Sequence, residues 1–194
     1  KLDGPGRLLI LPCLWNKLYK KSLFSENGIL IPENSAMGED FAANMKLLSS
    51  TEKITYLPEP LYFYVQHSGS IMSSSQNDIA KIMRNRDIIT SMNSVIDYFK
   101  KTGKYNEYFD ELEYLILCNV LFRAALRVNE CDYGSELQAE LVNYTVKKYP
   151  HFEKNKYYKQ LLSKKEKTII YFLKHKRFRT LHFVLRLNRK LQGR

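Results

Sequence analysis

The chain has 194 residues and a mass of 22.9 kDa, enough for one ordinary domain or for a small domain with an appendage. Hydrophobic residues make up 44% and charged residues 26%, which excludes a largely disordered or collagen-like chain. The net charge is +11, and the sequence shows neither a transmembrane run nor a signal peptide.

Short elements of mixed type are predicted over the first 72 residues. Near-helical spacing predicts short helices over residues 15–24 and 40–48, the first stopped by an Asn-Gly pair. A short buried strand is predicted at residues 29–31. Two further strands, rich in Ile, Tyr, Phe and Val, are predicted at residues 53–57 and 61–65.

Helical periodicity replaces these strand patterns after about residue 73. Apolar stripes at spacings of three and four predict helices over residues 79–99, 112–126, 135–149 and 154–162. The tail, residues 164–194, continues the helical pattern and is expected to be interrupted near Lys174–Arg177.

The positive charge is concentrated in that tail. From Lys164 to Arg194 there are six Lys and five Arg against one acid, Glu166, a net charge of +10. Residues 1–163 carry 20 basic and 19 acidic groups, a net charge of +1. This asymmetry predicts that the tail is an amphipathic basic helix or helix pair that meets an anionic surface.

Cysteine and histidine give no metal-binding or disulfide pattern. Cys13, Cys118 and Cys131 are an odd number without a close pair, so we expect reduced thiols in a reducing compartment. His175 and His182 lie seven residues apart with no acid between them. A metal site built from this chain alone is therefore not expected.

Three short polar segments could carry chemistry. Glu39 and Asp40 begin a predicted helix, where the helix dipole keeps a carboxylate ionised and able to accept a proton. Trp15-Asn16-Lys17 could stack on a sugar ring and hold its hydroxyls or a phosphate. The loop His67–Ser70 could bind phosphate. Taken alone, each is better explained as a helix cap, a core Trp or an ordinary turn.

The order and spacing of four motifs resemble bacterial family-two glycosyltransferases of the GT-A type, which build capsule, cell-wall and lipopolysaccharide glycans. The motifs are Trp15-Asn16-Lys17-Leu18-Tyr19, Gly38-Glu39-Asp40, Pro58-Glu59-Pro60-Leu61-Tyr62-Phe63-Tyr64 and Gly69-Ser70-Ile71-Met72. The resemblance covers about residues 8–73. It implies an α/β (α+β), predominantly helical chain: the C-terminal, acceptor-side half of a GT-A domain (1–73), a helical extension (74–163) and a basic tail helix (164–194).

The resemblance also implies roles for particular residues. Asp40 matches the catalytic base that deprotonates the acceptor hydroxyl in a single inverting displacement, and Glu39 matches its partner. Trp15, Asn16 and Lys17 match the segment that lines the acceptor and diphosphate side. His67 and Ser70 match positions near the donor phosphates, although members often have an Arg where His67 stands.

The family's nucleotide-binding sheet and Asp-x-Asp metal motif have no counterpart in this sequence. We therefore expect a part of a larger enzyme, inactive alone, whose full-length form uses Mg²⁺ or Mn²⁺, a nucleotide-sugar donor and a glycan or lipid-linked acceptor. The expected location is cytoplasmic, peripheral at the inner face of the cell membrane.

Two other functional classes remain open from the residues themselves. The chain could be a non-enzymatic helical module whose basic tail binds an anionic membrane or a polyanion. Nucleic-acid binding is the weakest alternative, because the aromatic residues are spread through the neutral part of the chain and no reader motif occurs.

Overall fold

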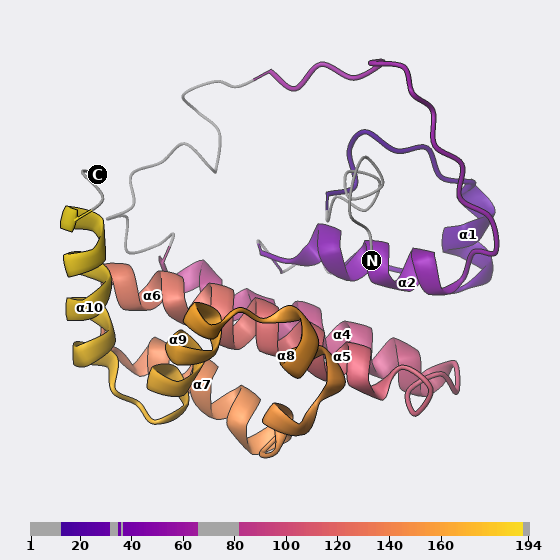
Figure 1. Ribbon diagram of the computed structural model, residues 1–194. Helices are drawn as coiled ribbons and strands as arrows, with labels where there is room; N and C mark the ends of the chain where they lie inside the picture. The colour runs from indigo at the N-terminus through magenta and orange to yellow at the C-terminus, as the bar shows by residue number, and fades with distance from the viewer. Residues whose placement is uncertain (1–12, 32–34, 36, 66–81, 192–194) are drawn as a thin grey trace.

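The computed structural model describes residues 13–31, 35, 37–65 and 82–191, and all regular structure among them is helical. Figure 1 shows two parts. Helices α4 to α10 form a helical body, and an N-terminal arm carrying α1 (Lys21–Glu26) and α2 (Glu39–Ser49) lies along one side of it. None of the helices in the described ranges is both long and apolar enough to cross a bilayer.

The body is built around one continuous helix that runs from Phe109 to Cys131. It consists of α5 (Phe109–Ile116), the π-helical segment η3 (Leu117–Ala124) and α6 (Ala125–Cys131). Neighbouring helices α4 (Asp87–Lys101), α7 (Glu136–Lys148) and α9 (Lys164–Lys174) contact η3. These contacts bury Leu117, Val120 and Leu121 completely, so η3 is the centre of the hydrophobic core.

Local sequence signals set the ends of the outer helices. Ser163 and Glu166 form a reciprocal capping box at the start of α9. Asn155 caps the short helix α8 (Lys156–Leu161) by accepting the Tyr157 N–H at 2.8 Å, and its Nδ2 donates to Glu113 Oε2 at 2.7 Å. Single-turn 3₁₀ helices in the described part of the chain include η2 (Arg84–Arg86) and η4 (Phe152–Lys154).

The tail forms a helical hairpin of α9 and α10 (Phe178–Leu191), and the turn between them falls at the interruption predicted near Lys174–Arg177. Figure 1 shows α10 crossing one end of the body. Leu181 of α10 is buried, and His182 Nδ1 lies 3.0 Å from the Asn129 carbonyl oxygen of α6. The inward face of α10 is therefore occupied by the body.

The arm is attached to the body through α2 and α4. Ala42, Ala43 and Leu47 of α2 are buried at this contact. At its far end the Ser50 hydroxyl lies 2.6 Å from the Tyr98 hydroxyl. The small alanines let the two helices approach closely, which fixes the direction in which the N-terminus of α2 points.

The predicted α/β fold, with a GT-A half over residues 1–73, is wrong: the described residues contain no strand or sheet. Residues 29–31, 53–57 and 61–65 have strand-like composition but no pairing partner in the described part of the chain. Every side chain from Lys53 to Val65 is exposed, and within the segment the Leu61 N–H donates to the Glu59 carbonyl oxygen at 3.0 Å. A strand exists only as part of a paired ladder, so strand propensity alone cannot produce one.

The helix predicted over residues 15–24 is also corrected, because α1 begins only at Lys21. Asn16 has a left-handed backbone angle, φ = 60°, which a helix cannot contain. After residue 82 the structure has helices over each predicted range, with the bounds given above.

Candidate functional site

The first turn of α2 holds the loop that precedes α1. Asp40 Oδ2 accepts a hydrogen bond from the Leu14 backbone N–H at 3.1 Å. The residue just before the Trp15 motif is thus bonded to the Gly38-Glu39-Asp40 motif, 26 residues further along the sequence. The carboxylate also lies at the positive end of the α2 dipole, where a negative charge is stabilised.

Asn44 lies one helical turn after Asp40 and forms hydrogen bonds with the same loop. Its Nδ2 donates to the Cys13 carbonyl at 3.0 Å, and its Oδ1 accepts from the Tyr19 hydroxyl at 2.7 Å. Lys17 Nζ donates to the same Cys13 carbonyl at 2.6 Å. Burial raises the pKa of Tyr19 to about 12, and the nearby Cys13 and Asp40 act in the same direction.

A partly exposed aromatic cluster lies on this loop. The Trp15 ring stacks on the rings of Tyr62 and Tyr64, with centroid distances of 5.2 and 5.0 Å and interplanar angles of 17° and 22°. Trp15 is 38% exposed, and the two tyrosines are 45% and 51% exposed. Partly exposed aromatic rings can pack against the apolar face of a sugar ring.

Glu39 starts α2 beside a glycine that the packing requires. Gly38 has φ = 84°, and a Cβ added there would lie 2.4 Å from Ile88 Cδ1 of α4. The absence of a side chain at residue 38 thus lets the start of α2 rest on α4. Glu39 Oε2 is buried and has no hydrogen-bond partner within the described part of the chain.

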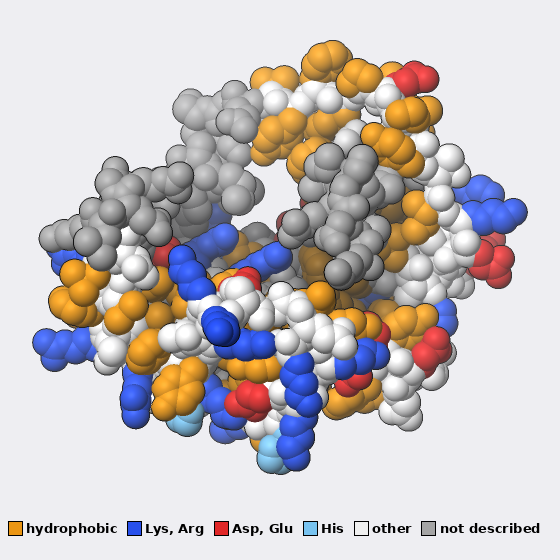
Figure 2. Space-filling model, viewed as in Figure 1, with side chains coloured by type: hydrophobic (Ala, Val, Ile, Leu, Met, Phe, Trp, Pro, Cys, Tyr) orange, Lys and Arg blue, Asp and Glu red, His pale blue; other side chains and the backbone are white. Residues whose placement is uncertain are grey.

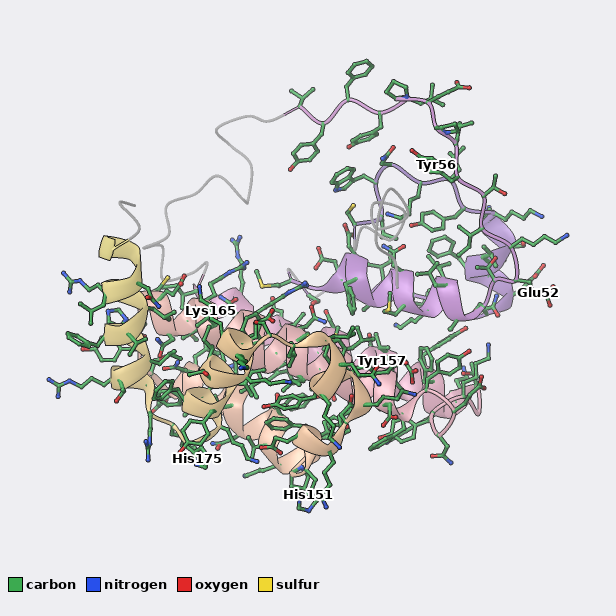
Figure 3. All side chains as sticks on the ribbon, viewed as in Figure 1. Glu52, Tyr56, His151, Tyr157, Lys165 and His175 are labelled. Carbon is green, nitrogen blue, oxygen red and sulfur yellow. The ribbon has the colours of Figure 1, made fainter. Side chains whose placement is uncertain are left out.

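Figure 3 shows how the arm arranges these residues, with Glu52 just past the end of α2 and Tyr56 on the segment that loops over it. This segment, residues 53–65, brings Tyr62 and Tyr64 back to the loop of Trp15. Three of the four sequence motifs therefore come together around the N-terminus of α2.

The predicted site residues divide into two groups. Trp15, Lys17 and Asp40 take part in the contacts described above, with Asn16 and Glu39 adjacent to them in the chain. His67 and Ser70 lie outside the described residues. Sequence reasoning missed Asn44 and the anchoring role of Tyr19, although the four-residue spacing from Asp40 to Asn44 places both on one face of a helix.

The sequence predicts no metal site built from this chain alone. Within residues 13–31, 35, 37–65 and 82–191, no three His, Cys, Asp or Glu side chains converge as metal ligands. The Mg²⁺ or Mn²⁺ that the family resemblance implies for the full-length enzyme stays a prediction. Comparisons with protein-family models, with curated proteins and with solved structures find no match to this chain.

Proposed function

We propose that this chain forms the acceptor side of a glycosyltransferase. In the proposed reaction an acceptor hydroxyl attacks the anomeric carbon of a nucleotide-sugar. The bond from that carbon to the nucleotide diphosphate breaks with inversion, and the hydroxyl proton passes to Asp40. The observation that carries the proposal is the 3.1 Å hydrogen bond from Leu14 to Asp40, which joins Asp40 to the residue before Trp15 of the aromatic cluster.

The aromatic cluster supplies the second support. A sugar ring could stack on Trp15 or on the two tyrosines. Trp15 follows Leu14 in the chain, and the Leu14 N–H is bonded to Asp40. The Asp40 carboxylate lies in the first turn of α2, at the positive end of the helix dipole. Glu39 is assigned as the partner of Asp40 at the same helix end. The donor and its metal would be held by polypeptide outside these 194 residues.

Trp15 makes acceptor binding measurable in the chain as it stands. It is the only tryptophan, so selectively excited tryptophan fluorescence reports on this site alone. Titration with a panel of neutral and acidic oligosaccharides is expected to shift or quench the emission for at least one of them. The double variant Tyr62→Ala with Tyr64→Ala should weaken that binding about tenfold or more.

Tyr56→Ala is the matched control. Tyr56 is an exposed tyrosine on the same segment, and the stacking contacts of Trp15 are to Tyr62 and Tyr64. It should bind saccharide as the unaltered chain does. A panel in which no saccharide changes the Trp15 emission would contradict the proposal.

Turnover tests the role of Asp40 separately. Asp40→Asn keeps an oxygen that can accept the Leu14 N–H but removes the base, so the complete enzyme should lose about 10²- to 10⁴-fold in kcat. Saccharide binding should stay nearly unchanged. Near-normal turnover by this variant would remove Asp40 from the mechanism, and turnover by the 194-residue chain alone would contradict the assignment of the donor site elsewhere.

A further inference from the structure

The α9–α10 hairpin carries most of the net charge of the protein on an exposed surface. Residues 164–194 have a net charge of +10. The carboxylate of their single acid, Glu166, accepts hydrogen bonds from the Ser163 N–H and hydroxyl in the capping box of α9. The basic side chains are therefore not neutralised within the hairpin, and several are exposed: Lys164, Lys165, Lys176, Arg177, Arg179 and Arg186.

α10 has a second apolar surface in addition to the one it buries. Phe178 and Leu181 face the body, while Phe183 is 60% exposed and Leu187 is 44% exposed. Phe183 and Leu187 are four residues apart and so share one face of the helix. Together they form an exposed apolar ridge that packing against the body does not explain.

Basic residues flank this ridge on the same helix. Arg179 lies four residues before Phe183, and Arg186 lies three residues after it, so both stand beside the ridge. In Figure 2 hydrophobic and basic side chains adjoin one another over α10, at the left of the molecule. Interfacial membrane helices have this arrangement, with apolar side chains inserted at the headgroup level and cations beside them.

The ridge continues into an apolar groove between the two helices. The groove has a volume of about 240 Å³ and is lined by Lys165, Thr168, Ile169 and Phe172 of α9 and by Leu181, Val184, Leu185 and Asn188 of α10. Val184 borders both the groove and the ridge. Figure 3 shows Lys165 on the side of α9 next to α10 and His175 at the turn of the hairpin.

We infer that the α9–α10 hairpin docks on an anionic phospholipid surface, with Phe183 and Leu187 inserted at the headgroup level and Arg179 and Arg186 facing lipid phosphates. Charge complementarity selects the anionic surface, and the exposed ridge selects a bilayer over a purely polar polyanion. The inward face of α10 is already covered by the body, so docking requires no rearrangement of the core. This inference does not depend on the proposed glycosyltransferase role.

Vesicle co-sedimentation of the full chain tests the inference. The vesicles are pure phosphatidylcholine, or phosphatidylcholine mixed with phosphatidylglycerol, at low and at high salt. Binding is expected to the mixed vesicles only, and to weaken as salt screens the charges. The variant Arg179→Gln with Arg186→Gln should lower the partition coefficient about 30-fold at low salt. Phe183→Ser with Leu187→Ser should lower it about tenfold or more.

The matched control neutralises two exposed lysines outside the hairpin, Lys21→Gln with Lys101→Gln. It has the same change in net charge and should bind vesicles almost as the unaltered chain does. Circular dichroism checks that each variant keeps its helix content, since all six altered residues are exposed.

Four results would overturn the inference. One is equal binding to both vesicle types, and another is no binding to either. The third is an equal loss of vesicle binding in the control and in the arginine variant. The fourth is vesicle binding that survives the Phe183 and Leu187 changes while heparin or RNA competes for the chain. The last would identify the hairpin as a polyanion site that does not use the apolar ridge.

Discussion

Asn44 shows at the residue scale how one side chain orders the candidate site. It links the Tyr19 hydroxyl and the Cys13 carbonyl, at the two ends of the loop that carries Trp15, Asn16 and Lys17. Asn44 itself is almost completely buried. Removal of its amide would therefore leave the half-buried Tyr19 hydroxyl and Cys13 carbonyl without these bonds.

Asn44→Ala is expected to destabilise the chain by about 1–3 kcal/mol, because the Tyr19 hydroxyl and the Cys13 carbonyl lose a partner. Chemical unfolding followed by Trp15 fluorescence measures the loss. The double variant Tyr19→Phe with Asn44→Ala should cost less than the sum of the two single changes, since the hydroxyl is then absent. Strict additivity would show that the Tyr19–Asn44 bond does not contribute.

Gly38 is a second position where a single residue determines how the arm packs against the body. Gly38→Ala is expected to cost about 2–3 kcal/mol, because it combines a left-handed φ of 84° with a Cβ placed 2.4 Å from Ile88 Cδ1. Thermal unfolding of the variant provides the measurement. Ile88→Val in the same chain should recover part of the loss, since it removes the Cδ1 atom.

Gly103 provides the control for Gly38. It also has a left-handed φ, 73°, but a Cβ there would meet nothing within 4 Å. Gly103→Ala should therefore show only the backbone strain, about 1 kcal/mol. Equal losses at the two glycines would mean that the contact between Gly38 and α4 is unimportant.

At the scale of elements, sequence periodicity predicted the helices of the body but not the state of the arm. The stripe that includes Met92, Ile96 and Phe99 specifies which face of α4 is buried, because a helix satisfies its own backbone bonds. Residues 53–57 and 61–65 have equally clear strand composition, but a strand depends on a partner elsewhere. Composition cannot reveal whether that partner is present.

The candidate site, too, was only partly predictable from the sequence. Glu39, Asp40 and Trp15 were identified from residue type and spacing. The hydrogen bond from Leu14 to Asp40 was not predictable, because it joins residues 26 positions apart, beside a left-handed φ of 60° at Asn16. Asn adopts that conformation more often than most residues, but this preference does not specify which Asn of a sequence will do so.

Glu113 of α5 makes the stability of the body depend on pH. Burial raises the pKa of Glu113 above its ordinary value of 4.5, although the hydrogen bond from Asn155 opposes the change. A raised carboxyl pKa means that the folded state holds the proton more tightly. The stability contributed by this group is therefore complete below pH 4.5 and is lost as pH rises through the raised pKa.

Glu113→Gln removes that dependence and keeps an oxygen for Asn155. We expect the variant to be more stable than the unaltered chain at pH 7, with the difference shrinking toward pH 4. Thermal unfolding at both pH values checks this. Glu52→Gln, at an exposed position, should give no such change, and an E113Q variant less stable at pH 7 would contradict the interpretation.

At the scale of the whole molecule, the protein combines a packed body with an arm that ends in an open segment. The body buries its apolar side chains around η3, whereas Ile54, Leu57, Leu61 and Phe63 of the arm are more than half exposed. Such a stretch of exposed apolar residues is uncommon in a stable monomer. The free energy of local unfolding should therefore be much lower in the arm than in the body.

Limited proteolysis with chymotrypsin is expected to cut within residues 53–65 before any site in residues 82–191. Tyr56, Tyr62 and Phe63 are exposed on backbone outside any helix, whereas Tyr98 and Phe99 are buried in α4. Mass spectrometry of the first products identifies the cut. An initial cut inside α4 to α10 would show that the body is the less stable part.

The π-helical segment η3 changes the direction in which the two halves of the central helix present their side chains. Each π turn holds one more residue than an α turn, and an α-helix advances about 100° per residue. The residues before Leu117 meet α8, while those after Ala124 meet α7 and α10. A one-residue insertion or deletion within Leu117–Ala124 would thus act as a rotation: it would turn the face that α6 presents to α7 and α10, relative to the face that α5 presents to α8, by about that same angle.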